Sequence, residues 1–215
     1  MKRTRRNSKN KARNIVFNYI KENAKIYLIL IIIFFIGLIL GILFVNNSNE
    51  TQSNQISSYI NNFINSVKEN YQISTKELLF SSIFNNICIA TLLWFLGSTV
   101  IGVPLIYLVI GYKGYCIGYT ISAITATLGT GKAILFIFST MLLQNIIYIP
   151  AIITLAVSGI KLYRLIMEDR RRENIKLQIF KHTIFFLLIL TILICSSLVE
   201  TYISGNLSQM LIKYC

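Results

Sequence analysis

The side chains that could do chemistry are few and scattered. Acid-base or nucleophilic catalysis needs grouped residues, such as a nucleophile beside a base, two carboxylates or a set of metal ligands. The chain has a single histidine, His182, only eight acids in 215 residues, and four cysteines without C-x-x-C spacing. His182 flanks an apolar run beside Lys181, which is typical of an interfacial side chain, and cysteines inside apolar runs are typical of buried thiols. We therefore predict no enzymatic activity, no catalytic residue, and no metal or cofactor site.

The more informative polar residues lie within apolar runs. Gln144 and Asn145 are followed by Pro150, which lacks an amide hydrogen and so leaves a carbonyl available for other contacts. Such amides often form hydrogen bonds between helices, which is the favoured interpretation, while lining a pathway or contacting a partner span is the alternative. Glu200 lies near the end of the last apolar run. It is either an interface anchor or a docking point for a partner's cation.

Helices that cross a membrane must position these residues. The sequence is 54% hydrophobic and 13% charged, whereas soluble domains carry about 25% charged residues. The run Ile26–Val45 has 20 residues without a charge and follows nine Lys/Arg, and this length matches the roughly 30 Å hydrocarbon core. The run is longer than the apolar region of a signal peptide and leads into Asn46 instead of a small-x-small cleavage site. We interpret it as a retained anchor.

Charge fixes the predicted topology. Further apolar runs cover Ile87–Ile110, Tyr115–Leu128, Ala133–Ile160 and Ile179–Ile203. Seven Lys/Arg lie in the segment 161–181, and basic loops stay in the cytoplasm, as the basic N-terminus does. An even number of spans must then separate the two clusters, so the short run Tyr115–Leu128 has to cross. The clusters favour a membrane over nucleic acid as the binding partner.

The predicted fold is therefore an all-α polytopic membrane protein with about five transmembrane helices. Its N-terminus is cytoplasmic and its C-terminus is outside. The predicted parts are a basic cytoplasmic segment 1–25, a membrane domain 26–203 with an outside loop 46–86 and a basic cytoplasmic loop 161–181, and an outside tail 204–215.

Small residues recur along the short third run. They lie at four-residue intervals, which places them on one ridge of a helix and predicts close packing with a neighbour: Gly114, Gly118, Ser122, Ala126 and Thr130. We expect this helix to be enclosed by its neighbours. Gly37 and Gly41 have the same spacing, and for a single pair like this a chance occurrence is the alternative.

The outside loop contains an amphipathic pattern. Apolar residues recur at steps of three and four, opposite Ser, Asn and Lys, and predict a helix: Ile56, Tyr59, Ile60, Phe63, Ile64 and Val67. Packing on the membrane surface and docking of a partner through Ile60, Phe63, Ile64 and Glu200 both remain open. The capping box Ser74-Thr75-Lys76-Glu77 predicts the start of a second helix that runs into the next span.

Five short blocks resemble the stage II sporulation protein M family. They occur in order along nearly the whole chain, after a basic N-terminus and a first anchor: Trp94-Phe95-Leu96-Gly97 with Gly102-Val103-Pro104, Lys113-Gly114, Gly118-Tyr119-Thr120, Gln144-Asn145 through Pro150-Ala151, and Ser196-Ser197 through Glu200-Thr201-Tyr202. The Gln-Asn to Pro-Ala block is the most specific. Within these blocks we assign Trp94 and Gly97 to helix packing.

The resemblance implies a role that residue patterns alone do not give. Members of the family are non-enzymatic membrane proteins of the mother cell. They hold two peptidoglycan-cleaving partners, stage II sporulation proteins D and P, at the sporulation septum for wall thinning and engulfment. The family is also similar in outline to permease subunits of ABC-type exporters, so transport is the alternative. Homo-oligomerisation is left open.

Overall fold

The computed structural model describes residues 18–68, 75–99, 101–138, 141, 143–168 and 175–204. Every regular element within these ranges is helical, which confirms the all-α class. The elements in chain order are α2 (Ala24–Asn46), α3 (Glu50–Lys68), α4 (Thr75–Gly97), α5 (Gly102–Leu128), α6 (Thr130–Ile137), α7 (Leu143–Glu168), α8 (Ile175–Val199) and the π-helical segment η2 (Glu200–Ser204).

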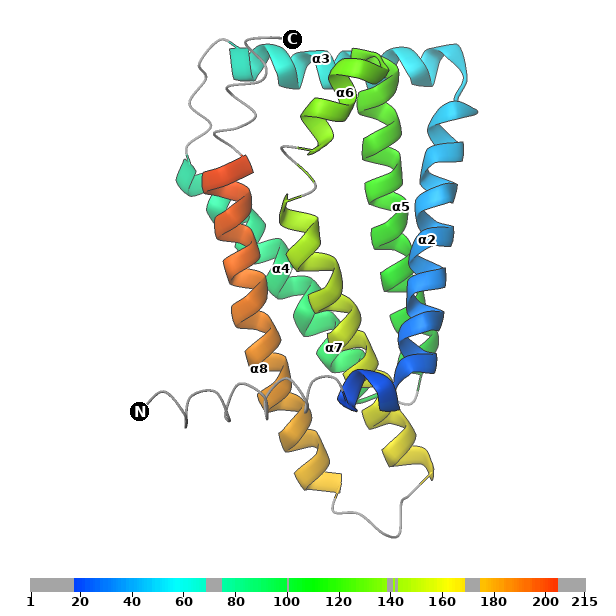
Figure 1. Ribbon diagram of the computed structural model, residues 1–215, viewed down its shortest axis with the longest axis vertical. Helices are drawn as coiled ribbons and strands as arrows, with labels where there is room; N and C mark the ends of the chain where they lie inside the picture. Colours follow the sequence, from blue (N-terminus) through cyan, green and yellow to red (C-terminus); the bar gives the residue numbers. More distant parts are fainter. Residues whose placement is uncertain are drawn as a thin grey trace.

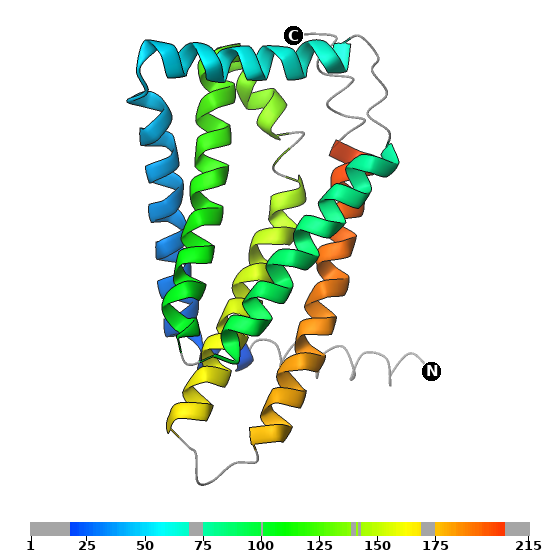
Figure 2. The ribbon, with the colours of Figure 1, turned by 180° about the vertical axis from the view of Figure 1, so that it is seen from behind.

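The long helices alternate in direction (Figure 1). Helices α2, α5 and α8 run upward in this view and α4 and α7 run downward, while α3 lies across the upper end of the bundle (Figures 1 and 2). The end of α7 and the start of α8 share the lower end with the start of α2. Because that end carries Lys161, Arg164, Lys176 and Lys181, we call it the basic end, and we call the opposite end the α3 end.

Length and composition support a polytopic membrane protein. Within the described part of the chain, four helical segments are long and apolar enough to cross a bilayer: Ala24–Asn46, Lys76–Gly97, Gln144–Met167 and Ile175–Tyr202. Large apolar side chains such as Leu28, Phe35 and Leu187 are exposed on the outside of the bundle, where lipid would surround them. Helix α5 has 27 residues, contains Lys113 and several tyrosines, and is not among these four segments. The count of five spans and their orientation remain predictions.

The predicted boundary of the second span is wrong. The apolar run Ile87–Ile110 is divided, because α4 ends at Gly97 and α5 begins at Gly102. The connection turns tightly, with the Thr99 N–H donating to the Leu96 carbonyl and the Gly102 N–H donating to the Thr99 carbonyl. Gly102 fits there because a Cβ at this position would lie 1.6 Å from the Leu96 carbonyl oxygen. Helix α4 begins at Thr75, which confirms the helix start predicted from the capping box, and its first turns lie inside the predicted loop 46–86.

The predicted third and fourth spans also change. Tyr115–Leu128 is the second half of α5, so a span of about 14 residues is not needed. Gly129, at φ 76°, ends that helix and precedes α6. The run Ala133–Ile160 is shared between α6 and α7, and α7 continues to Glu168. The predicted cytoplasmic loop 161–181 therefore includes the last turns of α7 and the first turns of α8.

Helices α2 and α5 pack in parallel through glycines. A Cβ at Gly114 would lie 2.1 Å from the Phe34 carbonyl oxygen, and one at Gly118 would lie 2.0 Å from that of Leu38. Gly37 and Gly41 of α2 are packed as tightly against α5, since a Cβ on either would lie 2.0 Å or 2.2 Å from a backbone oxygen of α5. Gly37 and Gly41 are thus part of the interface with α5, and chance does not explain their spacing. Only glycine permits this separation of the two backbones.

The small-residue ridge is shorter than predicted. Gly114, Gly118 and Ser122 are buried, and the Ser122 hydroxyl donates to the Asn46 side-chain oxygen at 3.1 Å. Ala126 is exposed, and Thr130 belongs to α6 because Gly129 ends the helix. Only the first three positions of the predicted ridge therefore face α2.

Helix α7, and not α5, is the enclosed helix. It contributes the largest share of the apolar core, with Ile152, Leu155 and Val157 fully buried. It meets α4 where Gly97 faces Gly159, since a Cβ on Gly97 would lie 2.6 Å from the Gly159 Cα. One side of α5 is open instead, with Leu108 and Tyr112 exposed.

Candidate functional site

A carboxylate lies among the helices at the α3 end. Glu200 begins η2 at the end of α8, within the candidate span Ile175–Tyr202. The Gln144 side-chain amide of α7 donates to its Oε2 at 2.6 Å, and the Ser82 hydroxyl of α4 donates to the same oxygen. Hydrogen bonds to an ionised acceptor are stronger than neutral ones. Three helices are thus joined at one side chain.

A second set of hydrogen bonds continues the cluster toward the core. The Asn86 amide of α4 donates to the Ser197 hydroxyl of α8 at 2.8 Å and to the Leu193 carbonyl at 3.4 Å. The Ser196 hydroxyl of α8 donates to the Gln144 backbone carbonyl at 3.3 Å. Asn86, Ser196 and Ser197 are buried, so these bonds satisfy polar groups that water does not reach. We call the whole set the α3-end polar cluster: Ser82, Asn86, Gln144, Ser196, Ser197 and Glu200.

The cluster has two features of a functional intramembrane site. An ionisable residue inside a membrane segment is costly unless it is paired or hydrated, and it commonly marks function. The turn that carries Glu200 is π-helical, a conformation that is frequent at functional sites. Both donors of Glu200 come from the chain itself. Both bonds go to Oε2, so the arrangement holds helix ends together, and docking of a partner's cation by Glu200 stays a prediction.

Asn145 and Pro150 lie apart from this cluster. Asn145 lines an apolar cavity of about 440 Å³ between α5, α6 and α7, together with Ile121, Met141 and Pro150. Helix α7 continues through Pro150, whose carbonyl accepts the Thr154 hydroxyl at 2.7 Å. Neighbouring helix residues project about 100° apart, which separates Gln144 from Asn145.

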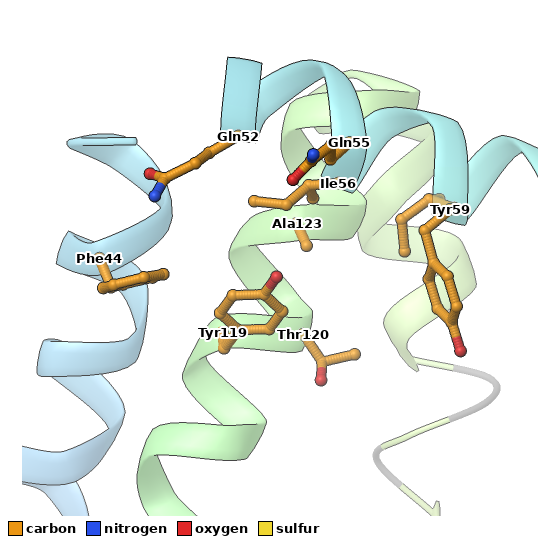
Figure 3. A pocket seen from close by; sticks show the side chains of 9 residues that line it. Phe44, Gln52, Gln55, Ile56, Tyr59, Tyr119, Thr120 and Ala123 are labelled. Carbon is orange, nitrogen blue, oxygen red and sulfur yellow. The ribbon is translucent and has the colours of Figure 1, made fainter. Parts of the chain in front are cut away.

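Helix α3 lies on the bundle through its apolar side. Ile60 packs against Ile124, Ala133 and Phe136 of α5 and α6. Beneath α3, a cavity of about 470 Å³ separates it from α2 and α5, and Figure 3 shows the side chains from the three helices that surround it: Phe44, Gln52, Gln55, Ile56, Tyr59, Ile60, Tyr119, Thr120 and Ala123. The side chains of Phe63 and Ile64 lie outside the described set. Of the three predicted docking residues in the loop, Ile60 is thus engaged within the chain.

A smaller polar group joins α4, α7 and α8 near the basic end. The Trp94 indole N–H donates to the Thr183 hydroxyl at 3.2 Å, and its ring is 5.8 Å from that of Phe186. His182 is buried, and its Nδ1 lies 2.8 Å from the Ser158 hydroxyl oxygen. Among the described residues, no three of His, Cys, Asp and Glu are grouped closely enough to hold a metal ion.

Ser82, Asn86 and Ser197 of the cluster are not among the predicted site residues. Their spacing contains a signal, because Ser82 and Asn86 are four residues apart and Ser197 precedes Glu200 by three. Polar residues at these steps within an apolar run share a helix face. The sequence does not show that the two faces meet Gln144.

The fold and this cluster define a polytopic helical membrane protein with a polar intramembrane site. Comparison with known families makes this more specific, because the family model for stage II sporulation protein M matches residues 30–205. The chain belongs to this family, as its sequence blocks indicated, and is a sporulation-related membrane protein. No curated protein and no solved structure matches the chain.

Proposed function

We propose that the protein is a non-enzymatic membrane scaffold of endospore formation, located in the mother-cell membrane at the septum. Its partners are the peptidoglycan-cleaving stage II sporulation proteins D and P, which it holds in place during wall thinning and engulfment. Family membership supports the process. The position of α3 across one end of the bundle (Figure 1) supports a role in holding partner proteins.

Helix α3 is fixed on one side and open on the other. Its apolar side packs on the bundle through Ile60. The opposite side presents Asn54, Ser58, Asn61 and Asn65, all exposed. These four residues are spaced by four, three and four, so they share one face. A preformed helix with amide and hydroxyl side chains binds a partner without a large ordering cost.

This face replaces Ile60 as the proposed docking surface. The positive-inside rule puts the basic end in the cytoplasm, so α3 faces the compartment that contains the wall. The α3-end polar cluster stabilises the helix ends at the same end of the bundle as α3, because it fixes the end of α8 to α4 and α7.

An exporter subunit would need a polar route from one end to the other. Along α8, the polar residues His182 and Ser197 are separated by the buried Ile189 and Leu193. Along α7, Gln144 and Ser158 are separated by buried residues that include Ile152 and Leu155. The apolar core therefore lies between the two polar groups, which favours the scaffold over transport.

The test introduces charge and bulk on the open face of α3. We expect Asn61→Arg combined with Asn65→Arg to leave the protein inserted and abundant, because neither side chain is in the core. The fluorescently tagged partners should lose their septal position in sporulating cells, and the septal wall should persist. The graded comparison is Asn61→Ala with Asn65→Ala, which removes the amides without adding charge or bulk and should weaken localisation less than the arginine pair does.

Two results would contradict this proposal. Correct localisation of both hydrolases in a strain that lacks the protein would reject the scaffold and make transport the function to test. Cleavage of peptidoglycan by the purified protein would reject the non-enzymatic role.

A further inference from the structure

A cavity of about 210 Å³, lined by apolar, hydroxyl and ammonium side chains, opens at the basic end, far from α3. The helical segment 18–22, the last turns of α7 and the first turns of α8 surround it. Nine residues line this basic-end cavity: Tyr19, Ser158, Lys161, Leu162, Leu165, Gln178, Lys181, His182 and Phe185. It shares no lining residue with the cavity beneath α3.

Two ammonium groups border this cavity from different helices. Lys161 belongs to α7 and Lys181 to α8, and none of the nine lining residues is acidic. The Lys161 Nζ lies 5.1 Å from the centroid of the Tyr19 ring, a cation-π contact that holds it beside the cavity. The Tyr19 ring in turn lies 5.9 Å from that of Phe185. Like charges around one opening repel each other, and a bound anion relieves that repulsion.

Two hydroxyl groups complete the lining. Burial raises the pKa of the Tyr19 phenol to about 12, Tyr27 adds to the increase, and a hydrogen bond with Ser158 opposes it. The phenol is therefore neutral at neutral pH and is bonded to Ser158. His182 orients Ser158 through the 2.8 Å bond at Nδ1. The other ring nitrogen points toward α4, because a Cβ at Gly97 would lie 3.2 Å from it.

Ammonium groups beside hydroxyl donors recognise phosphate. The surroundings identify the phosphate as part of a lipid. Leu177, Phe180 and Ile184 of α8 are exposed next to the cavity residues, with 49%, 61% and 51% of their surface accessible. Acyl chains can lie along these side chains while the headgroup enters the cavity. Basic residues at a membrane end also attract anionic lipids.

We propose that the basic-end cavity binds the phosphate of an anionic phospholipid from the adjacent leaflet. Lys161 and Lys181 supply the charge, and the hydrogen-bonded chain Tyr19–Ser158–His182 supplies one neutral hydroxyl donor when His182 Nδ1 carries the proton. This inference does not rest on the scaffold role, because it concerns other residues at the opposite end of the bundle.

The chain contains its own reporter for a binding assay. Trp94 is the single tryptophan, and its indole bonds to Thr183, the residue after His182. Full-length protein, purified in detergent and stripped of lipid, is titrated with short-chain phosphatidylglycerol, short-chain phosphatidylcholine or inorganic phosphate. Fluorescence of Trp94 and the thermal midpoint are recorded. We expect a saturable change and a higher midpoint with phosphatidylglycerol, and weaker effects with the other two ligands.

Matched double variants separate a site from general attraction. Lys161→Gln with Lys181→Gln removes two charges that line the cavity. Arg164→Gln with Lys176→Gln removes two exposed charges from the same two helices, outside the lining. If each lysine that contacts the headgroup contributes about fivefold, the first pair should weaken binding roughly 25-fold. The second pair does not line the cavity and should change binding by less than about fivefold.

If the first double variant does not fold, the single variant at the exposed Lys181 tests the site by itself. Lys181→Gln should weaken binding about fivefold, with Lys176→Gln as its control. Equal losses in the cavity and control variants would overturn the site. Equal binding of both lipids, or binding of inorganic phosphate as tight as that of phosphatidylglycerol, would overturn the assignment to an anionic lipid.

Discussion

Replacing Gly118 with alanine tests the close packing of α5 against α2. The new Cβ would lie 2.0 Å from the Leu38 carbonyl oxygen, 2.8 Å from its carbonyl carbon and 3.0 Å from its Cα. Ordinary van der Waals contact begins at 3.4 Å. These are backbone atoms, which cannot rotate away as the end of a side chain can. Helix α2 would therefore have to move by more than 1 Å at this point.

The magnitude follows from two opposing effects. Overpacking of a core costs about 1–3 kcal/mol, while alanine in a helix gains up to about 1 kcal/mol over glycine. We expect the free energy of unfolding to fall by about 1–2 kcal/mol, because the added Cβ meets the backbone of Leu38, which cannot rotate away. For a chain of this size, the thermal midpoint should fall by about 2–8 °C.

Gly131→Ala is the matched control. Gly131 lies in α6, and a Cβ there meets no atom within 4 Å. Only the helix propensity changes, so the midpoint should stay constant or rise. Both variants are compared with the wild type by circular dichroism during heating, in one detergent. Equal shifts for the two variants would show that α2 and α5 do not meet at Gly118.

Two further predictions concern the polar cluster and the topology. Glu200→Ala removes the acceptor for Gln144 and Ser82 and should lower the free energy of unfolding by roughly 0.6–2 kcal/mol. Glu200→Gln keeps an acceptor oxygen and should lower it less. Equal losses for the two variants would argue against the hydrogen bonds as the cause. In a background without native cysteines, a cysteine at the exposed Ser58 should react with an impermeant thiol reagent in intact cells, and one at Lys176 should not. Labelling at both positions would reject the five-span count.

Local sequence was enough to predict the class of protein and most of its helical segments. A run such as Ile26–Val45 identifies itself by length and lack of charge, since a bilayer imposes both. The period of apolar residues in the loop predicted α3 without knowledge of its neighbours. Apolarity alone misplaced the boundary near Gly97, because an apolar run does not show where two helices are joined by a tight turn.

The candidate site depended on the tertiary structure. Gln144 and Glu200 are 56 residues apart, and Ser82 is 118 residues from Glu200. The sequence identified two of these residues as polar groups in apolar runs, but their contact depends on how α4, α7 and α8 are rotated about their axes. That rotation is set by packing between helices, such as Gly97 against Gly159. The sequence therefore determined which residues a membrane would bury, and the packed bundle decided which of them meet.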